Sequence, residues 1–424
     1  MLKGQIIPAG QPKGRPTFRV RESRVTTARL LSPLILFLLV ACWPPDSDDE
    51  WLLATLLISP SSLCDAELVA GTIQSSRCPL ALKGITSTFA GPGAGSSTKG
   101  DADGASNVAR FNNPAGITTD GVHLYVSDLA NNKIRKIEIV TGTVSTIAGP
   151  AAGCYSSCAS GDADGAGNAA RFNQPVGITT DGTNLYVADG ANNKIRKVVL
   201  ATGEVSTFAG PGPGSSTAGT SDGIGTAARF SFPYGIVLIS GYLYVSDFGS
   251  HRIRRIDLNT AEVVTIAGSS SGDADGTGTS AHFNGPAGLA ADSNSLYIAD
   301  SQNNKIRKLS LATNMVSTIL GPEAGNTIAG DHQGDGHSAR FNNPRGLSCD
   351  GSSLYIGDSG NNKLRKAALS TLAVTTLAGP VDGNISSGSS DGADARFLFP
   401  QHSVSDGQYL YIVDLGNAKI RRVQ

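Results

Sequence analysis

The sequence predicts an all-β protein, a six-bladed β-propeller with four antiparallel strands in each blade. Glycine is abundant, with 52 of 424 residues, and only 16% of residues are charged. This profile is typical of many short strands joined by turns. One sequence pattern recurs six times, which indicates a repeat architecture. The chain also begins this pattern with a segment that its last copy lacks, as a closed ring requires.

Each repeat contains the same series of short segments. A basic residue and a Phe follow an Asp-Gly pair by five or seven residues, and variants of NPAGITTDG, LYVSD, NNKIRKI and VSTIAG come next. The six Phe residues, spaced 53 to 61 residues apart, are Phe111, Phe172, Phe230, Phe283, Phe341 and Phe397. The Asp residues of the Asp-Gly pairs are Asp103, Asp164, Asp222, Asp275, Asp335 and Asp391.

Four strands are expected in each repeat, and in the first they cover residues 116–120, 123–128, 133–139 and 143–149. The second strand is rich in aromatic and β-branched residues, and TDG and TG turns separate the strands. A fourth-strand sequence, TSTFAG, already occurs at residues 86–91, whereas the last repeat stops after its third strand at residue 424. We therefore expect this N-terminal strand to complete the last blade and close the ring.

These motifs resemble NHL repeats, a propeller family marked by RFNNPAGI, LYVSD and NNKIRKI. The resemblance covers residues 85–424 in six copies. It implies a six-bladed propeller but no particular function, because relatives include binding modules, sensor ectodomains, lyases and RNA-binding domains.

The N-terminus is typical of an export signal. A basic arm precedes the short apolar run 34–40, and Leu39-Val40-Ala41-Cys42 resembles a bacterial lipobox. The expected domains are a signal peptide at 1–41, a lipid-anchored tether at 42–84 and a propeller at 85–424. Lipidation of Cys42 would attach the protein to a membrane. Trp43 after it favours the outer membrane, on either its periplasmic or its surface face.

The charge distribution argues against nucleic-acid binding. Residues 1–41 hold seven of the 34 basic residues and one of the 35 acidic residues, so the rest of the chain carries a net charge of −7. Phosphate contacts need clustered positive charge. We expect a monomer whose ligand is a protein, a peptide or a glycan.

The six cysteines agree with an exported protein. Besides Cys42, two pairs are close enough in sequence to form disulfides: Cys64 with Cys78, and Cys154 with Cys158. Cys349 is left over and is interpreted as a buried thiol. The CYSSC segment lacks the second Cys/His pair of a metal site.

The segment with the Asp-Gly pair is interpreted as the connection that returns from the rim of one blade to the axis. We expect its Phe to fill the space between blades and its Arg to bind loop carbonyls or an Asp. No cofactor is expected, although structural Ca²⁺ is the alternative interpretation. Its weak candidate ligands are Asp101, Asp103, Asp162, Asp164, Asp273 and Asp275.

Departures from the repeat mark the candidate ligand site. Pro-x-Gly opens five of the six innermost strands, the sixth has His402 in place of the Gly, and the middle residue varies. The candidate ligand-binding residues, predicted to line one end of the axial channel, are Phe232, Tyr234, Arg345, Phe399 and His402. No Ser/His/Asp set is placed for catalysis, so we expect a non-enzymatic binding platform. The alternative is a hydrolase or lyase with a metal-assisted site in the axial channel.

Overall fold

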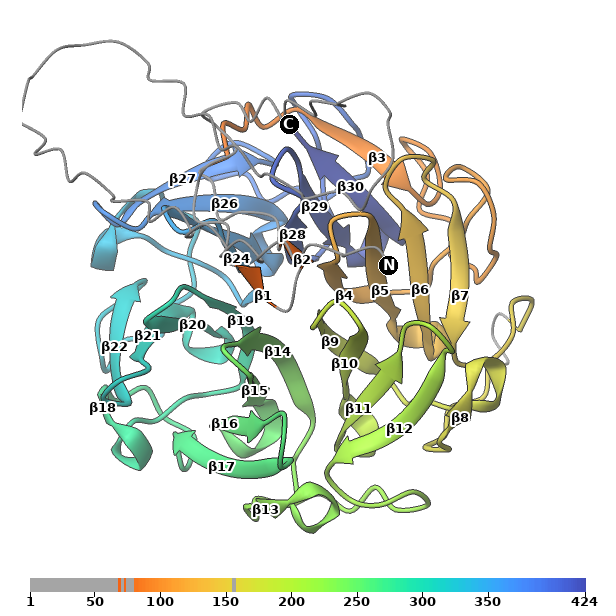
Figure 1. Ribbon diagram of the computed structural model, residues 1–424. Helices are drawn as coiled ribbons and strands as arrows, with labels where there is room; N and C mark the ends of the chain where they lie inside the picture. Colours follow the sequence, from red (N-terminus) through yellow and green to blue (C-terminus); the bar gives the residue numbers. More distant parts are fainter. Residues whose placement is uncertain (1–67, 70–71, 74–79, 155–157) are drawn as a thin grey trace, which may run out of the picture. The chain divides into compact units, whose positions relative to one another are not determined.

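The computed structural model describes residues 68–69, 72–73, 80–154 and 158–424. The predicted signal peptide and most of the predicted tether, with Cys42, Cys64 and Cys78, lie outside these residues. The chain separates into two compact units, and the second, Leu57–Gln424, contains every described element. Residues 80–424 form the predicted propeller, whose blades surround a common axis (Figure 1).

Each blade is an antiparallel sheet whose first strand lies at the axis. The innermost strands are β4 (Pro114–Thr119), β9 (Pro175–Thr180), β14 (Pro233–Ile239), β19 (Pro286–Ala291), β24 (Pro344–Cys349) and β28 (Pro400–Ser405). The second strands are β5 (His123–Asp128), β10 (Asn184–Asp189), β15 (Tyr242–Asp247), β20 (Ser295–Asp300), β25 (Ser353–Asp358) and β29 (Leu410–Asp414).

The two outer strands of each blade follow in the same order. The third strands are β6 (Lys133–Glu138), β11 (Lys194–Val199), β16 (Arg252–Asp257), β21 (Lys305–Ser310), β26 (Lys363–Ala368) and β30 (Lys419–Val423). The fourth are β7 (Val144–Ala148), β12 (Glu204–Ala209), β17 (Glu262–Ala267), β22 (Met315–Leu320), β27 (Ala373–Ala378) and, in blade 6, β3 (Thr86–Ala90).

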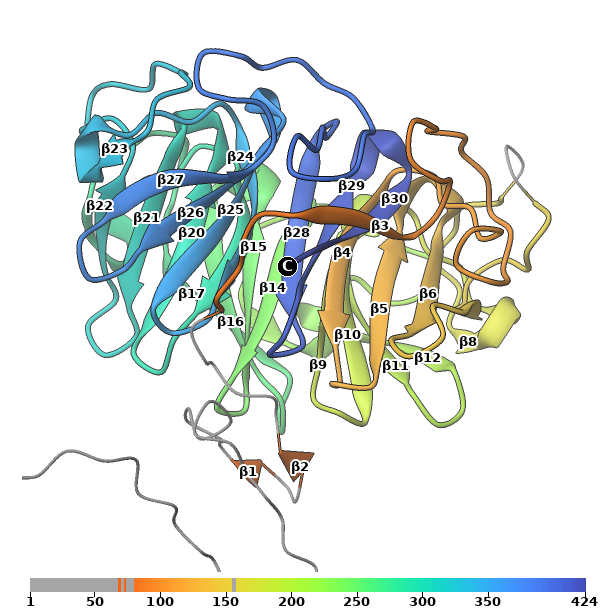
Figure 2. The same ribbon diagram turned by 90° about the horizontal axis from the view of Figure 1, so that it is seen from above.

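The ring closes as the sequence predicts. β3 pairs antiparallel with β30, and Thr86 lies opposite Val423 (Figure 2). The backbone N–H of Thr88 and its hydroxyl both bind the Asp391 carboxylate, which fastens β3 to the last return connection. This pairing covers the edge of β30 that would otherwise have no neighbouring strand.

The prediction of four strands per blade is refined by a short fifth one. In four blades a two-residue strand pairs with the outer edge of the fourth strand: β8 (Gly165–Ala166), β13 (Gly223–Ile224), β18 (Gly276–Thr277) and β23 (Gly334–Asp335). Single bridges from Gly104 to Val144 and from Gly392 to Thr86 take this place in blades 1 and 6. The return connection therefore pairs along the rim of its own blade before it reaches the axis.

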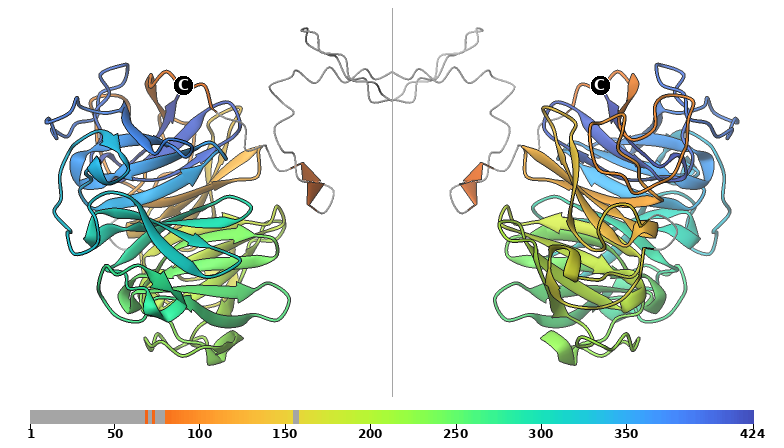
Figure 3. Two further views of the ribbon diagram at one scale, coloured as in Figure 1. Left: turned by 90° about the vertical axis from the view of Figure 1, so that its left-hand side faces the viewer. Right: turned by 90° about the vertical axis from the view of Figure 1, so that its right-hand side faces the viewer.

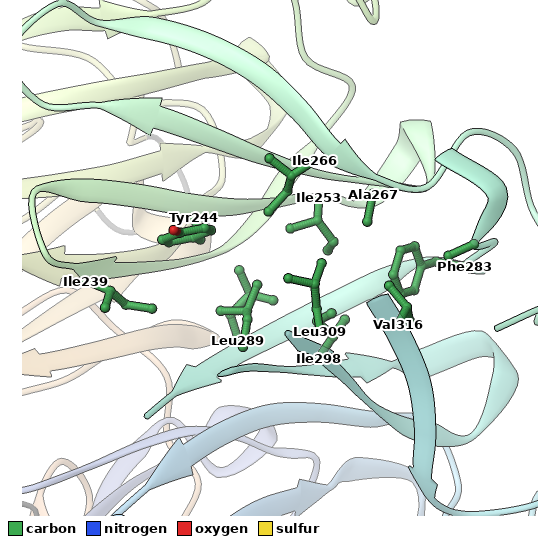
Figure 4. Packing of buried hydrophobic residues seen from close by; sticks show 12 residues of the cluster. Ile239, Tyr244, Ile253, Ile266, Ala267, Phe283, Leu289, Ile298, Leu309 and Val316 are labelled. Carbon is green, nitrogen blue, oxygen red and sulfur yellow. The ribbon is translucent and has the colours of Figure 1, made fainter. Parts of the chain in front are cut away.

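The core lies between adjacent blades. Phe283 is fully buried in one such layer, with Ile253 of blade 3 and Leu289 and Leu309 of blade 4 around it. Figure 4 shows these side chains filling the space between the two sheets. All six Phe residues of the repeat are fully buried, which confirms that they fill the inter-blade space.

Single 3₁₀ turns are the only helices among the described residues, and none is long and apolar enough to cross a membrane. Six follow the second strands: η2 (Leu129–Asn131), η4 (Gly190–Asn192), η6 (Phe248–Ser250), η8 (Ser301–Asn303), η10 (Ser359–Asn361) and η11 (Leu415–Asn417). Four lie in return connections: η3 (Gly167–Ala169), η5 (Gly225–Ala227), η7 (Gly278–Ser280) and η9 (Gly336–Ser338). A short hairpin pairs β1 (Leu68–Val69) with β2 (Thr72–Ile73). Figure 3 shows the blades from two sides.

Candidate functional site

The recurring carboxylates form the scaffold by pairing with buried cations. In blade 1, Arg135 is fully buried and pairs with both Asp103, at 2.7 Å, and Asp128, at 2.7 Å. Its guanidinium lies over the Phe111 ring, 5.1 Å from the centroid. Lys133 binds Asp101 at 2.7 Å. The repeated residues therefore connect each return segment to the third strand of its own blade.

The same pairing uses the weak calcium candidates of the other blades. Asp162 and Asp273 bind lysines, whereas Asp164 and Asp275 bind arginines, and all four cations are fully buried. Each carboxylate that was a candidate Ca²⁺ ligand therefore forms an ion pair with a Lys or an Arg. The recurring Arg of the basic-Phe pair binds loop carbonyls, as Arg110 does with Asn107 and Ala109.

The side chains of Asp128 and its equivalents accept the backbone N–H of the return connection, Asn112 in blade 1, and Asp128 does not cap the turn that follows it. One expectation about the Asp-Gly pairs is wrong. In blade 5 the residue equivalent to Asp103 is Gln333, not Asp335, because Gln333 accepts the backbone N–H of Thr376. Asp331 pairs with both Lys363 and Arg365 there. In this repeat the Asp of the Asp-Gly pair lies five residues before the basic residue instead of seven, so Asp335 does not align with Asp103.

Adjacent blades are joined at the end of the ring where the inner strands begin, which we call the turn end. The residue before each inner-strand Pro has a positive φ, and in five of the six blades its N–H binds a side chain of the preceding blade. Asn193 accepts from Phe232 at 2.7 Å, and Asn362 accepts from Phe399 at 3.0 Å. Ala418 replaces this Asn where blade 6 meets blade 1.

Two phenylalanines occupy a backbone conformation that normally favours Gly or Asn. Phe232 has a φ of 52° and Phe399 has a φ of 54°, whereas the other four blades have Asn, Gln or Gly at this position. A bulky residue is an uncommon occupant of the left-handed region. Strain of this kind is enriched at functional sites.

The structure brings four of the five predicted ligand-binding residues together near the axis at the turn end. Together with two residues that the sequence analysis did not select, they form what we call the axial cluster: Phe232, Tyr234, Phe248, Arg345, Gln401 and His402. Phe399 lies at the same end, but its half-exposed ring contacts no other ring among the described residues.

Tyr234 reaches across the ring axis. Its hydroxyl donates to Gln401 Oε1 at 2.7 Å, so a side chain of blade 3 binds one of blade 6, on the opposite side of the ring. The corresponding residues of blades 1, 2 and 4, Ala115, Val176 and Ala287, are small and pack around Tyr234. The predicted channel end is therefore bridged by a hydrogen bond.

Arg345 lies over two aromatic rings and has no carboxylate partner among the described residues. Its guanidinium carbon is 5.4 Å from the ring centroids of both Tyr234 and Phe248, at the distance of a cation–π contact. The guanidinium has no hydrogen bond or ion pair with any residue that the structure describes. It is half-buried, so this cation is partly removed from water, and its N–H donors bind no protein group among the described residues.

His402 takes the place of a glycine and leaves one polar atom unpaired. At the equivalent Gly346, a Cβ would collide with the carbonyl oxygen of the next blade, and the other four glycines are equally crowded. At the junction of blades 6 and 1, His402 Nδ1 instead donates to the Ala115 carbonyl at 3.2 Å. The residue is 8% exposed, and its buried Nε2 has no partner among the described residues.

The surroundings keep the His402 imidazole neutral. Burial lowers the pKa of His402 to about 4, and the Arg345 cation acts in the same direction. With its proton on Nδ1, the ring presents an unprotonated Nε2 that can only accept a hydrogen bond.

Phe248 and Gln401, the two residues of the axial cluster that the sequence analysis did not select, differ in how clearly the sequence indicates them. Phe248 follows the Asp that ends the second strand, where other blades have Leu, Gly or Ser. That departure from the repeat was a detectable signal. Gln401 was visible as a variable Pro-x-Gly position, but its contact with Tyr234 depends on the ring geometry.

Cys154 and Cys158 form a disulfide in the return connection that enters blade 2. Both lie beside Asp101, and these three residues are the one cluster of metal-ligand types found in the described part of the chain. Its thiols are joined in the disulfide, and its carboxylate binds Lys133. This cluster lies outside the inner strands.

Comparison with known proteins gives relatives that include NHL repeat-containing proteins. Human NHL repeat-containing protein 2 is 28% identical over 316 residues, covering 67% of this chain and 42% of its own length. The Arabidopsis thaliana protein SUPPRESSOR OF QUENCHING 1, chloroplastic, is 29% identical over 287 residues, covering 64% of this chain and 26% of its own length. The chain thus spans less than half of each of these relatives. No protein-family profile matches it.

Solved structures share the fold at low sequence identity. A Bacteroides thetaiotaomicron protein of unknown function aligns with a TM-score of 0.58 and 22% identity, covering 80% of this chain and 75% of its own. An auxiliary nutrient binding protein of the same organism aligns with a TM-score of 0.59 and 17% identity, covering 80% and 76%. The six-bladed ring and the repeat-bearing relatives together support a place for this chain in the NHL-repeat propeller family.

Proposed function

We propose that this chain is an exported, membrane-tethered binding propeller whose turn end holds a protein, peptide or glycan ligand. The observation that carries the proposal is the axial cluster. Its residues depart from the repeat, and they converge although they come from blades 3, 5 and 6. Aromatic rings with a few convergent polar groups are typical of ligand sites.

The energetics of the scaffold support a binding role for this cluster. The buried arginines of the third strands, which we call the scaffold arginines, are neutralised by carboxylates. Arg345 has N–H donors and His402 has an acceptor without a protein partner among the described residues. Leaving a buried polar atom such as His402 Nε2 unpaired costs free energy, so a ligand that pairs with it gains affinity. Export and lipid attachment rest on the basic arm, the apolar run and Cys42.

The experiment screens the purified full chain against peptide and glycan arrays, with Phe248→Ala as the test variant. Phe248 contacts both Arg345 and Tyr234, so we expect the variant to lose at least about tenfold in affinity for the array hits. Val140→Ala is the control, because Val140 is a fully exposed residue in the turn before β7. Hits bound equally by wild type and Phe248→Ala would rule out the axial cluster as the binding site.

A further inference from the structure

Two polar groups without a partner among the described residues lie on side chains that both flank Tyr234, and their chemistry is complementary. The Arg345 guanidinium offers N–H donors and a positive charge, whereas His402 Nε2 offers a single lone pair. They come from β24 and β28, the inner strands of neighbouring blades. A ligand that satisfies both must carry an anionic acceptor and, beside it, a hydrogen-bond donor.

The other polar side chains around this point already have partners. Tyr234 binds Gln401, and Gln401 Nε2 lies 3.4 Å from the Ser359 hydroxyl. The hydroxyls of Ser359 and Ser301 donate to the carbonyls of Pro400 and Pro344, each at 2.5 Å. The site can therefore pair with few polar atoms of a ligand.

The remaining surface of the site is apolar. Phe232 packs edge-on against Phe248, with ring centroids 6.4 Å apart, and Leu129 and Phe232 border the buried residues around Tyr234. The Phe399 ring, 49% exposed, lies at the same end of the ring. An apolar group on the ligand would gain free energy by covering these side chains.

We propose that the axial cluster binds the C-terminal residue of a peptide whose last side chain is apolar. The carboxylate accepts from the Arg345 guanidinium, and the N–H of the same residue donates to His402 Nε2. The apolar side chain packs against Phe232 and Phe248. This inference rests on the proposed function and names its ligand class.

The small number of unpaired polar groups in the axial cluster favours a peptide C-terminus over an acidic sugar as the ligand. A uronic acid also has a carboxylate beside a donor, but it carries further hydroxyls that need partners once they leave water. The axial cluster has few unused polar atoms to offer them, because Tyr234, Gln401 and both serines are already bonded. A terminal apolar residue places only its carboxylate and N–H at the two open groups.

The test uses three probes with the full chain: the peptide Gly-Gly-Gly-Phe labelled at its N-terminus, its C-terminal amide, and labelled digalacturonate. Fluorescence polarisation measures each affinity. We expect the acid to bind wild type at least about tenfold more tightly than the amide, because a charge-assisted pair is lost on amidation. Arg345→Ala should weaken the acid to the level of the amide and leave the amide unchanged. His402→Phe should weaken both.

Arg255→Ala is the matched control, since Arg255 also lies over one aromatic ring, Tyr242, at 4.8 Å, but on the third strand of blade 3. It should bind all probes as wild type does. Equal affinity for acid and amide, binding of digalacturonate instead of the peptide, or no binding of the peptide would each overturn the inference. Array hits that require Phe248 but no free C-terminus would leave the proposed function standing while this inference fails.

Discussion

Arg254 in blade 3 and Arg345 in blade 5 both lie over aromatic rings, but only Arg254 is neutralised. The Arg254 guanidinium is 5.1 Å from the Phe230 centroid and binds Asp222 at 2.7 Å and Asp247 at 3.1 Å. Arg345 has two rings beneath it and no carboxylate within reach among the described residues. The scaffold uses its arginines to connect chain segments, whereas the axial cluster leaves one available.

Removing a scaffold carboxylate is the change expected to have the largest effect. Asp189 is fully buried and accepts from Asn173, Asn192 and Arg196. Burial raises the pKa of Asp189 to about 6, so hydrogen bonds from the surrounding donors are needed to stabilise the charged carboxylate. Asp189→Ala should lower the free energy of unfolding by about 3–5 kcal/mol, because it leaves buried donors without their acceptor. Urea unfolding followed by circular dichroism measures it.

Arg345→Ala supplies the other half of this comparison. Since Arg345 has no ion pair to lose, its removal should change the free energy of unfolding by less than about 1 kcal/mol. Equal losses for Asp189→Ala and Arg345→Ala would show that the two arginine environments do not differ as described.

The second prediction concerns acid stability at the axial cluster. The pKa of His402 falls from its ordinary 6.5 to about 4 on folding, so the folded protein binds this proton later than the unfolded chain does. The stabilisation is complete above pH 6.5 and is lost as the pH falls toward 4. It changes by up to about 1.4 kcal/mol per pH unit in that window. His402→Gln should remove this dependence.

The measurement compares unfolding free energies of wild type and His402→Gln at several pH values between 4 and 8. Other carboxylates titrate in both proteins, so only the difference between them reports on His402. Parallel curves across this range would contradict burial of a neutral His402 beside Arg345.

A smaller loss of stability than that of Asp189→Ala is expected at the contact between blades. Asn193 has a φ of 55° and accepts from the Phe232 N–H. Asn193→Ala should cost about 1–2 kcal/mol, from the lost hydrogen bond and the left-handed backbone. Asn314→Ala is matched, because Asn314 has a φ of 54° but lies in the turn before β22. Thermal unfolding should show a greater loss at Asn193, and equal losses would exclude the inter-blade contact as a stabilising interaction.

The repeat made most of the fold predictable. Six copies of one pattern specified six blades, and the displaced fourth strand at residues 86–91 specified the closure. The buried Phe residues were predictable because each repeat must fill the same inter-blade space. The short fifth strands were missed, since two glycine-rich residues carry no strand signal.

The candidate site was only partly predictable. The departures at Tyr234, Arg345 and His402 are visible in the repeat alignment, but the alignment does not specify which side chains meet across the axis. The hydrogen bond from Tyr234 to Gln401 spans 167 residues of sequence. The equivalence of Asp335 with Asp103 failed because the register of a connection of different length is set by its partners on β27.

The sequence by itself determined the blades, their number and the strand that joins the ends, because repeated local patterns encode repeated local structures. Tertiary structure alone decided which polar side chains are paired with other protein groups and which have no partner among the described residues. The scaffold arginines and Arg345 carry the same side chain. The folding of each blade brings two carboxylates to every scaffold arginine. No carboxylate of the described residues reaches Arg345, because pairing depends on distances that chain spacing does not specify.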